Sequence, residues 1–342
     1  MYPKRPAPLT PRLIVQRALS VALCLTMLPA MARADDPREL RLASDIWPPF
    51  TDATDRQGVA VELVHTALQR AGISATTTIV EWKEVETGIR KSRFDGCAAM
   101  WRTEKRARDL FFSQPYLENR LVLVGRRGSD VSATKMSDLA GRRVAAVGRY
   151  AYGSEIENSI GVYYINSRND QDSLDKLLAG EVEYMLVDEL VVRYLLTHQR
   201  EEAISKLEIG STTLGRRKLH LAIRRDLPGA REIIDAFNAE IRTMLADGTY
   251  AGILQVGWIR ADVDGDGLDE LVTLGDSLGQ TPPGSVYDVF GDAIETDPEK
   301  ERVFVAGSIY EGWDAVPEEY KRQTVPDEQK MKLGTTIFTL KF

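Results

Sequence analysis

The segment Thr103–Arg106 has the residue types of an anion-binding site. It follows the apolar run at 97–101, so we expect a loop and a helix start just beyond a buried strand. A threonine at a helix N-cap accepts a backbone N–H, and the first turn presents free N–H groups to an anion. Arg106 would add a guanidinium that binds a carboxylate through two hydrogen bonds. The alternative is an exposed arginine in weak surface ion pairs.

The segment Asp262–Glu270 has the spacing of a calcium-binding loop. Side-chain oxygens stand at positions 1, 3, 5 and 9, and the glycine at position 6 permits a tight turn. The expected ligands are Asp262, Asp264, Asp266, Leu268 and Glu270. The loop resembles those of integrin-type and dockerin-type repeats, although Thr273 stands where a complete EF-hand has its bidentate glutamate. We expect a structural calcium ion; the alternative is a solvated Asp-Gly turn.

Strands and helices alternate from Glu39 onward. Apolar and β-branched runs predict strands at 40–44, 76–80 and 94–101, and helical spacing predicts helices at 61–71 and 85–90. The segment Trp47–Phe50 contains two prolines and is therefore expected to form a loop. Such alternation predicts a mainly parallel sheet covered on both faces.

A second cycle of the same kind follows the glycine-containing break at 125–129. Further strands are predicted at 121–124, 143–147, 163–165, 184–187 and 220–223, and further helices at 136–139, 174–178, 191–198 and 230–246. We therefore expect one sheet, then a second, and then a return to complete the first. Ligands of open α/β sheets bind beyond the C-terminal ends of strands, where Arg106, Tyr150 and Asp188 would lie.

Residues 1–34 have the features of an export signal. Basic residues precede an apolar run at 18–27, and Ala32-Arg33-Ala34 is an A-x-A cleavage site. The run falls short of the roughly 20 apolar residues that span a bilayer, which disfavours a membrane anchor. We expect cleavage near Ala34 and a periplasmic mature chain. That chain keeps the single cysteine Cys97, so an internal disulfide is excluded.

The charge of the chain is unevenly distributed. The formal net charge of the 342 residues is −7, and residues from Asp262 onward include 18 acidic and 7 basic side chains. This asymmetry marks a boundary near residue 261. Strand-like runs at 271–274, 302–306 and 335–340 predict a small β-rich extension at 262–342. Neither part has the basic patch of a nucleic-acid-binding protein, no mature segment is apolar enough to span a membrane, and we expect a monomer.

Six motifs occur in an order and spacing that resemble a known family. They are Trp47–Phe50, Phe94–Gly96, Thr103–Arg106, Phe112–Tyr116, Asp138–Val144 and Gly180–Asp188. The chain resembles the periplasmic solute-binding proteins of the polar amino-acid type (family 3 extracellular solute-binding proteins), two-lobed ligand traps that serve ABC transporters. The resemblance covers about residues 39–258. It implies an α/β, two-lobed periplasmic binding protein type II fold, with lobe 1 at 37–126 and 217–258 and lobe 2 at 127–216.

The resemblance also implies a ligand site. In that family the arginine matching Arg106 clamps the ligand α-carboxylate, and the acidic residue matching Asp188 binds the α-ammonium. The aromatic residue matching Trp47 packs on the ligand side chain. The loop that contains Arg149 and Tyr150 supplies donors from lobe 2. The alternatives are that Asp188 caps the helix at 191–198 and that the aromatic residues belong to the core.

The chain departs from the family pattern just before the TEKR segment. Ala99 and Trp101 stand where amino-acid binders carry small hydroxyl or backbone-donating residues, and Arg102 adds charge beside the cleft. The expected ligand is therefore a small carboxylate, either amino-acid-like or aromatic or cyclic. Trp101 and Arg102 join the predicted ligand contacts.

We expect a binding protein that delivers this ligand to an ABC transporter. A second hypothesis is an enzyme on the same fold, resembling the periplasmic cyclohexadienyl dehydratases. For that reaction the candidate acids or bases near strand ends are Glu81, Glu84 and Asp188. No nucleophile–base pair is visible in the sequence, so the binding protein is favoured. A third hypothesis is a sensory or cell-surface module whose tail contacts a partner.

Overall fold

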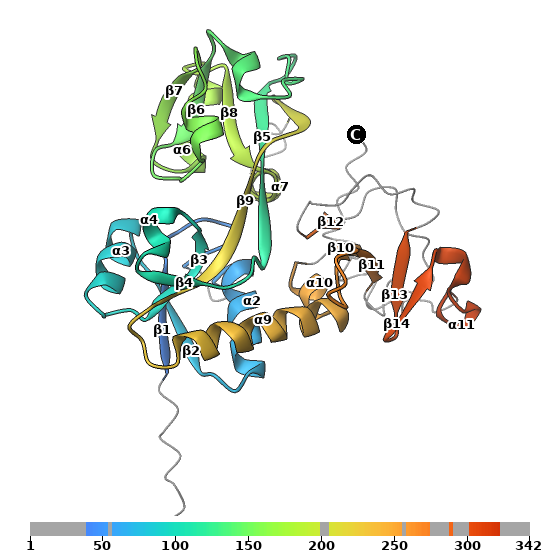
Figure 1. The fold of residues 1–342 in the computed structure, drawn as a ribbon. Helices are drawn as coiled ribbons and strands as arrows, with labels where there is room; N and C mark the ends of the chain where they lie inside the picture. Colours follow the sequence, from blue (N-terminus) through green and yellow to red (C-terminus); the bar gives the residue numbers. More distant parts are fainter. Residues whose placement is uncertain are drawn as a thin grey trace, which may run out of the picture. The chain divides into compact units, whose positions relative to one another are not determined.

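The computed structural model describes residues 39–53, 57–198, 205–254, 258–273, 287–289 and 301–321 (Figure 1). All of these residues belong to one compact unit, Glu39–Phe342. The predicted export signal at 1–34 lies outside the described residues. Among the helices of the described ranges, none is long and apolar enough to cross a bilayer.

Lobe 1 is built on parallel strands, as the alternating pattern predicts. Its strands are β1 (Leu40–Ser44), β2 (Ala75–Ile79) and β3 (Gly96–Trp101), and its first helices are α2 (Val59–Arg70) and α3 (Trp82–Arg90). Successive side chains of a strand point to opposite faces. Leu42 therefore packs in the large core cluster that includes the apolar stripe of α2, whereas Ala43 packs with Val85 and Ile89 of α3. Helices thus cover both faces of this part of the sheet.

Two long strands join the lobes into one mixed sheet. They are β5 (Leu117–Arg126) and β9 (Leu207–Arg224), which pair antiparallel from Leu117↔Leu219 to Arg126↔Leu207. The C-terminal part of β9 also pairs with β3 and with β4 (Leu110–Phe112), while β5 pairs with β8 from Leu121 to Gly125. The resulting order is β2-β1-β3-β9-β5-β8-β6-β7. The expectation of two separate sheets was therefore wrong, because two strands continue through both lobes.

Lobe 2 repeats the parallel arrangement. Its strands are β6 (Arg143–Val147), β7 (Tyr163–Ser167) and β8 (Tyr184–Asp188), and its helices are η1 (Met136–Leu139), α5 (Ser154–Glu157), α6 (Asp170–Ala179) and α7 (Glu189–His198). Asn169 caps α6 by accepting the Asp172 N–H at 2.8 Å, and Gly180 ends it in a left-handed conformation. Asp188 is the last residue of β8, at the edge where the sequence placed it.

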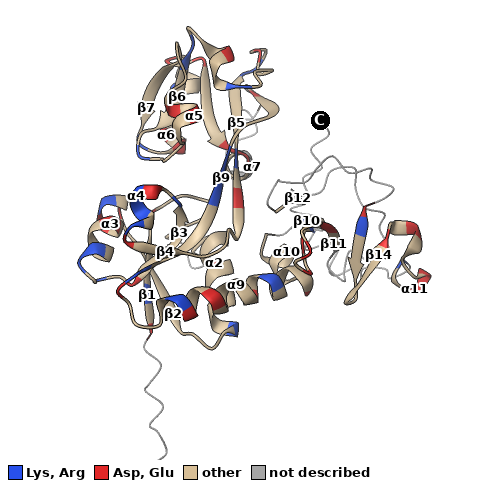
Figure 2. Ribbon diagram, viewed as in Figure 1, with Lys and Arg blue, Asp and Glu red and all other residues tan. Residues whose placement is uncertain are grey.

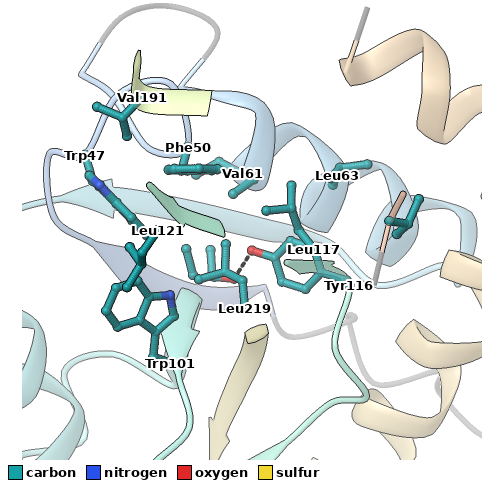
Figure 3. Packing of buried hydrophobic residues seen from close by; sticks show 14 of the residues in the cluster. Trp47, Phe50, Val61, Leu63, Trp101, Tyr116, Leu117, Leu121, Val191 and Leu219 are labelled. Atoms are coloured by element: carbon teal, nitrogen blue, oxygen red, sulfur yellow. Dashed lines mark hydrogen bonds between the residues drawn. The ribbon is translucent and has the colours of Figure 1, made fainter. Parts of the chain in front are cut away.

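The remaining helices complete lobe 1. They are α4 (Glu104–Ala107), α9 (Ala230–Ala246) and α10 (Thr249–Leu254). The apolar residues Ile234, Phe237 and Ile241 of α9 are buried, and acidic and basic residues both occur along the same helix (Figure 2). Tyr116 is fully buried in the core, where its hydroxyl donates to the Ala98 carbonyl at 2.9 Å (Figure 3). The Tyr250 hydroxyl donates in turn to the Tyr116 carbonyl at 2.6 Å, which ties α10 to the start of β5.

The C-terminal extension contains a second sheet of order β12-β10-β11-β13-β14. Its elements are β10 (Trp258–Ala261), β11 (Glu270–Thr273), β12 (Tyr287–Asp288), β13 (Arg302–Val305), β14 (Ser308–Glu311), η3 (Trp313–Ala315) and α11 (Glu318–Lys321). The antiparallel pair β10–β11 brackets the predicted calcium loop. The strands predicted at 271–274 and 302–306 correspond to β11 and β13. Residue 274 and the strand predicted at 335–340 lie outside the described residues.

Candidate functional site

Thr103 caps the short helix that carries Arg106. Its Oγ1 accepts a hydrogen bond from the Arg106 backbone N–H at 3.2 Å, and its own backbone is extended. The N-cap predicted directly after β3 is therefore confirmed. Helix α4 spans just Glu104–Ala107. A single turn contributes a weak dipole, so the guanidinium must supply most of the attraction for an anion.

The side chain of Arg106 is half-buried and held in place from two sides. Its Nη1 donates to the Trp101 carbonyl at 2.7 Å, and its Cζ lies 4.6 Å from the centroid of the Trp82 ring. Burial lowers the pKa of Arg106, although a guanidinium stays protonated at neutral pH. Within the described ranges Arg106 forms no ion pair, in contrast to the surface arginine of the alternative interpretation. It is a positioned cation that makes no ion pair with a described residue, although Glu86 and Asp45 lie near enough to oppose the effect of burial on its pKa.

Aromatic side chains from both lobes meet beside this arginine. Trp47 and Trp101 come from lobe 1, and their ring centroids are 5.4 Å apart in an edge arrangement (Figure 3). The ring centroid of Tyr150, in lobe 2, lies 5.3 Å from that of Trp47 and 5.5 Å from that of Trp101. The ring centroid of Tyr152 lies 6.1 Å from that of Trp101. Tilted and edge arrangements are the favourable ones for aromatic pairs. The structure thus brings together the predicted residues Trp47, Trp101 and Tyr150.

The loop after β1 fixes the position of Trp47. The backbone N–H of Trp47 donates to the Thr51 carbonyl at 2.8 Å, and the Thr51 hydroxyl donates to the Asp45 carbonyl at 2.5 Å. The Pro48–Pro49 peptide bond is cis. This compact turn directs the indole into the core cluster, where the side chain is buried against Phe50. The loop predicted from the two prolines therefore presents Trp47 to the other aromatic rings.

Asp188 has two different oxygen environments. Its Oδ1 accepts the backbone N–H groups of Leu190 at 2.7 Å and Val191 at 3.3 Å, so the carboxylate caps α7 as the alternative interpretation proposed. Its Oδ2 is buried and makes no hydrogen bond with a described residue. The side chain is 2% exposed, and burial raises the pKa of Asp188 to about 7. Capping therefore occupies one oxygen and leaves the other without a partner.

Asn119 on β5 links Asp188 to the aromatic side chains. Its Oδ1 accepts the Trp101 indole N–H at 2.7 Å, and its amide lies close enough to Asp188 to lower the pKa of that carboxyl. The Asn119 Nδ2 nevertheless makes no hydrogen bond of good geometry with a described residue. Trp101 in turn presents its carbonyl to Arg106. The proposed cation and the proposed anion are thus connected through Trp101 and Asn119.

Two acidic side chains that the sequence did not single out lie near Tyr150, whose pKa is raised by burial and by both carboxylates. Asp45 follows β1 directly, and burial raises its pKa to about 6. Asp170 lies in the first turn of α6, accepts the Tyr150 hydroxyl at 2.9 Å, and has its pKa raised by burial to about 6. The position of Asp45 at a strand end was a usable signal. Asp170 follows a strand by three residues and carried no such signal.

The other predicted charged residues lie near the surface. Arg102 has an exposed side chain that pairs with Glu104 at 3.1 Å, so the structure does not support it as a cleft residue. Arg149 is also exposed, but its Nη2 lies 3.6 Å from Oε2 of Glu81 in the other lobe. Glu84 pairs with Arg93 at 2.7 Å. Exposed, ion-paired glutamates lack the environment that tunes a catalytic acid or base.

The family profile of the bacterial extracellular solute-binding proteins, family 3, matches residues 40–259. The chain belongs to this family. The match covers both lobes and ends where the second sheet begins, so the C-terminal extension is an addition to the family domain. The two-lobed α/β arrangement is the one that the resemblance implied. The family and the relatives described next are binding proteins, which favours binding over catalysis for this member.

Two curated relatives of this family 3 protein bind L-cystine. The L-cystine-binding protein TcyJ of Escherichia coli K12 is 22% identical over 222 residues, covering 64% of this chain and 80% of TcyJ. The L-cystine-binding protein TcyA of Bacillus subtilis is 23% identical over 222 residues, covering 64% of this chain and 79% of TcyA.

Solved structures share the fold of the family 3 domain. An ancestral arginine-binding protein bound to arginine has a TM-score of 0.54 and 21% identity, covering 64% of this chain and 96% of that one. The GluR0 ligand-binding core of Nostoc punctiforme in complex with L-glutamate has a TM-score of 0.52 and 18% identity, covering 63% and 97%. The periplasmic VFT2 domain of Bordetella pertussis BvgS has a TM-score of 0.54 and 22% identity, covering 64% and 93%.

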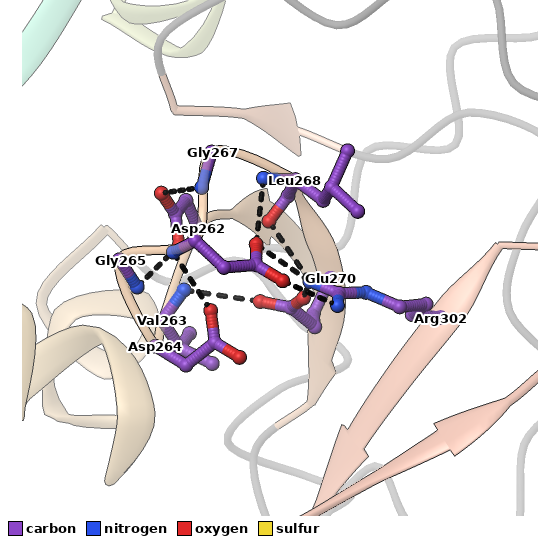
Figure 4. A network of polar contacts seen from close by, with 9 residues as sticks. Asp262, Val263, Asp264, Gly265, Gly267, Leu268, Glu270 and Arg302 are labelled. Atoms are coloured by element: carbon purple, nitrogen blue, oxygen red, sulfur yellow. Dashed lines mark hydrogen bonds and ion pairs between the residues drawn. The ribbon is translucent and has the colours of Figure 1, made fainter.

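Beyond the family domain, the β10–β11 loop gathers part of the predicted calcium ligand set (Figure 4). Carboxylate oxygens of Asp262, Asp264 and Glu270 lie within 4.8 Å of one another. Asp262 also accepts the backbone N–H groups of Gly265 at 2.6 Å and Gly267 at 3.0 Å, which fixes the turn. Hard oxygen ligands on a tight turn fit the chemistry of calcium.

Arg302 of β13 occupies the other side of this loop. Its guanidinium pairs with Asp266 at 2.8 Å, donates to the Leu268 carbonyl at 3.2 Å, and contacts the fully buried Glu270 (Figure 4). Pairing with Arg302 lowers the pKa of Asp266 to about 2. Of the predicted ligands, Asp266 and Leu268 therefore bond to an arginine and lie outside the group of three converging carboxylates, although the Asp266 backbone N–H donates to Asp264 Oδ1 at 3.1 Å. An internal cation already compensates part of the negative charge of the loop.

Proposed function

We propose that this protein captures a small amino-acid-like carboxylate between its lobes and delivers it to an ABC transporter. One observation carries the proposal. The Arg106 guanidinium is half-buried and the Asp188 Oδ2 is buried, and neither forms an ion pair with a described residue. A zwitterion would supply the missing carboxylate and the missing ammonium. Amino-acid binding by the cystine-binding relatives agrees with this ligand class.

Burial makes the two positions selective for such a ligand. An ionised group removed from water is costly unless it is paired and hydrogen-bonded. A ligand that adds the opposite charges would reduce the free-energy cost of holding Asp188 and Arg106 away from water without a charged partner. The ligand would favour lobe closure because it binds the closed state more tightly than the open state. The strands β5 and β9, which continue through both lobes, would serve as the hinge.

Family membership supports a proposal for the location and partners. Its members are extracellular solute-binding proteins. We propose that residues 1–34 direct the chain to the periplasm and are removed near Ala34, so that the mature protein acts there as a monomer. The partners would be the membrane subunits of an ABC transporter.

The ligand proposal is tested by titrating the purified mature protein with L-amino acids and with aromatic and cyclic carboxylates. Calorimetry should show saturable binding of at least one zwitterion. Arg106→Ala should weaken that binding by about 100-fold, because a charged hydrogen-bonded pair is lost. Arg108→Ala removes a neighbouring exposed arginine and should leave the affinity unchanged. If Arg106→Ala and Arg108→Ala bind the ligand with equal affinity, Arg106 does not bind the ligand carboxylate.

We further propose that the Asp262–Glu270 loop binds a structural calcium ion. The convergence of three carboxylates within 4.8 Å supports this proposal. Calcium should raise the melting temperature by mass action. Arg302→Gln removes the internal cation beside buried Glu270 and should make the stability of the extension more dependent on calcium. A wild-type melting profile and tail proteolysis that are identical in calcium and in chelator would contradict the calcium site.

A further inference from the structure

Two opposite residues of the hinge strands contact both sides of the candidate site. Asn119 of β5 and Arg217 of β9 are paired directly in the antiparallel ladder, so their side chains lie on the same face of the two strands. The Asn119 Oδ1 accepts the indole N–H of Trp101 at 2.7 Å. The Arg217 Nε donates to the Ala151 carbonyl at 3.2 Å, in the lobe 2 loop at 148–153. One position along the hinge therefore meets a site residue of lobe 1 and the site loop of lobe 2.

The side chain of Arg217 is half-buried and points in a defined direction. Its Nη1 donates to the carbonyl of Arg216, in its own strand, at 2.6 Å. Burial lowers the pKa of Arg217, and the nearby carboxylates of Glu155 and Glu157 partly oppose this effect. Holding a guanidinium away from water is costly unless its N–H groups find acceptors. The hydrogen bond to Ala151 therefore favours this direction over one that leads into solvent.

Gly153, at the end of the same loop, leaves room for the guanidinium. Its φ is 86°, in the left-handed region that favours glycine, and an added Cβ would lie 2.2 Å from the Arg217 Nη2. The obstacle is the far end of a flexible side chain, so an alanine at this position would displace the guanidinium and not the strand. Gly153 and Arg217 thus depend on each other for their contact.

The 148–153 loop carries two of the aromatic rings of the site. Its first half is bonded to the end of β6, because the backbone N–H of Tyr150 donates to the Val147 carbonyl at 3.1 Å and the backbone N–H of Val147 donates to the Tyr152 hydroxyl at 3.0 Å. Its second half is the part that Arg217 contacts. The place of the tyrosine rings beside Trp101 therefore depends on a residue of the hinge.

We propose, building on the proposed function, that Arg217 is a positioning residue of the ligand site. It holds the 148–153 loop from the hinge strand β9, while Asn119 holds Trp101 from β5, and it acts on the captured molecule through the loop. A loop that is already in place loses less conformational entropy when a ligand binds, so the affinity is higher. Because the contact starts on a hinge strand, bending of β5 and β9 during closure would move the loop with it.

Fluorine NMR of the mature protein labelled with 5-fluorotryptophan tests the positioning without any ligand. The chain has five tryptophans, and single Trp→Phe variants assign their resonances. Arg217→Ala should shift or broaden the Trp101 resonance, because both tyrosine rings of the loop lie beside that indole. The resonances of Trp258 and Trp313, in the C-terminal extension, should stay as in wild type. A residue with a purely structural role would change the melting temperature and leave the Trp101 resonance unmoved.

Calorimetry with the panel of L-amino acids and carboxylates tests the effect on binding. Arg217→Ala should weaken the ligand that wild type binds most tightly by about 10-fold, the low end of the range for one charged hydrogen bond. Arg168→Ala is the control, since it removes a lobe 2 arginine whose side chain is 86% exposed. This control should keep the affinity within about twofold.

Gly153→Ala perturbs the same contact from the side of the loop. It should move the Trp101 resonance and weaken binding while Arg217 is still present. The double variant Gly153→Ala/Arg217→Ala should bind no more weakly than the weaker single variant, because the contact can be lost only once. Should Arg217→Ala fail to fold, Gly153→Ala alone serves for both measurements.

The outcomes separate the inference from the function on which it rests. A Trp101 resonance that both single variants leave unmoved, or affinities within about twofold of wild type, overturns the positioning role and leaves the solute trap intact. Fully additive losses in the double variant overturn the Gly153–Arg217 contact as their common cause. Absence of binding by every amino acid and carboxylate tested overturns the proposed function, while the Trp101 resonance still decides whether Arg217 positions the loop.

Discussion

Replacing Asp188 with asparagine should stabilise the unliganded protein at high pH. The burial that raises the pKa of Asp188 from 3.8 to about 7 favours the neutral carboxyl group in the folded chain. At about 1.4 kcal/mol for each tenfold change in proton affinity, the charged form reduces stability by up to roughly 4 kcal/mol. Asparagine is also a good N-cap, so the hydrogen bonds to Leu190 and Val191 should persist.

The sign of the effect depends on pH in a defined way. Below pH 3.8, Asp188 is protonated in both the folded and the unfolded chain. The folded chain then has its full stability, because it does not bear the cost of a buried charge. That stability is lost as the pH rises through about 7. The advantage of Asp188→Asn should therefore be small near pH 4, grow up to about pH 7, and then stay constant.

Urea unfolding of wild type and Asp188→Asn at several pH values measures this difference. Asp175→Asn is the matched control on an exposed site and should follow the wild type. The same asparagine variant should lose ligand affinity at neutral pH, because the anion for the α-ammonium is gone. A variant less stable than wild type above about pH 7 would refute the reasoning, since the carboxylate would then have a stabilising partner.

Two further predictions concern other residues. Tyr116→Phe should lower the free energy of unfolding in urea by about 1 kcal/mol, because the buried hydrogen bond to the Ala98 carbonyl is lost; no change would mean that the bond contributes nothing net. Gly58→Ala should cost more than about 2 kcal/mol in the same assay, because φ is 89° and a Cβ would lie 2.4 Å from the Phe50 carbonyl oxygen; a silent substitution would show that the loop can shift.

Local features of the fold could be predicted from the sequence because they depend on neighbouring residues. The cap at Thr103 and the stripe of α9 follow from side-chain type and helical spacing. The long strand β9 was underestimated, since only 220–223 has an apolar run. Its earlier part is rich in polar and charged residues and is extended because its backbone pairs with β5. Tertiary pairing therefore overrode local composition.

The candidate site was predictable to the extent that motifs mark single positions. Arg106, Trp47 and Tyr150 were found in this way, but their contacts were not. Asn119 meets Trp101 because β5 and β3 both pair with β9, a relation that no spacing along the chain reveals. Asp170 meets Tyr150 because α6 packs against β6, the strand that precedes the Tyr150 loop. Side chains that gain their role from the meeting of distant segments leave little local signal.

The position of β9 in the large sheet also sets the order in which the chain can assemble. β9 lies between β3 and β5, although it follows β3 by more than a hundred residues in the chain. Until β9 is present, the fully buried strand β3 has an open edge of backbone donors and acceptors and exposes apolar side chains. Lobe 1 therefore cannot complete itself until the chain has been synthesised through β9. If residues 1–34 direct export as proposed, a lobe that closes late would keep the precursor unfolded for longer, the condition that passage through a narrow translocation channel requires.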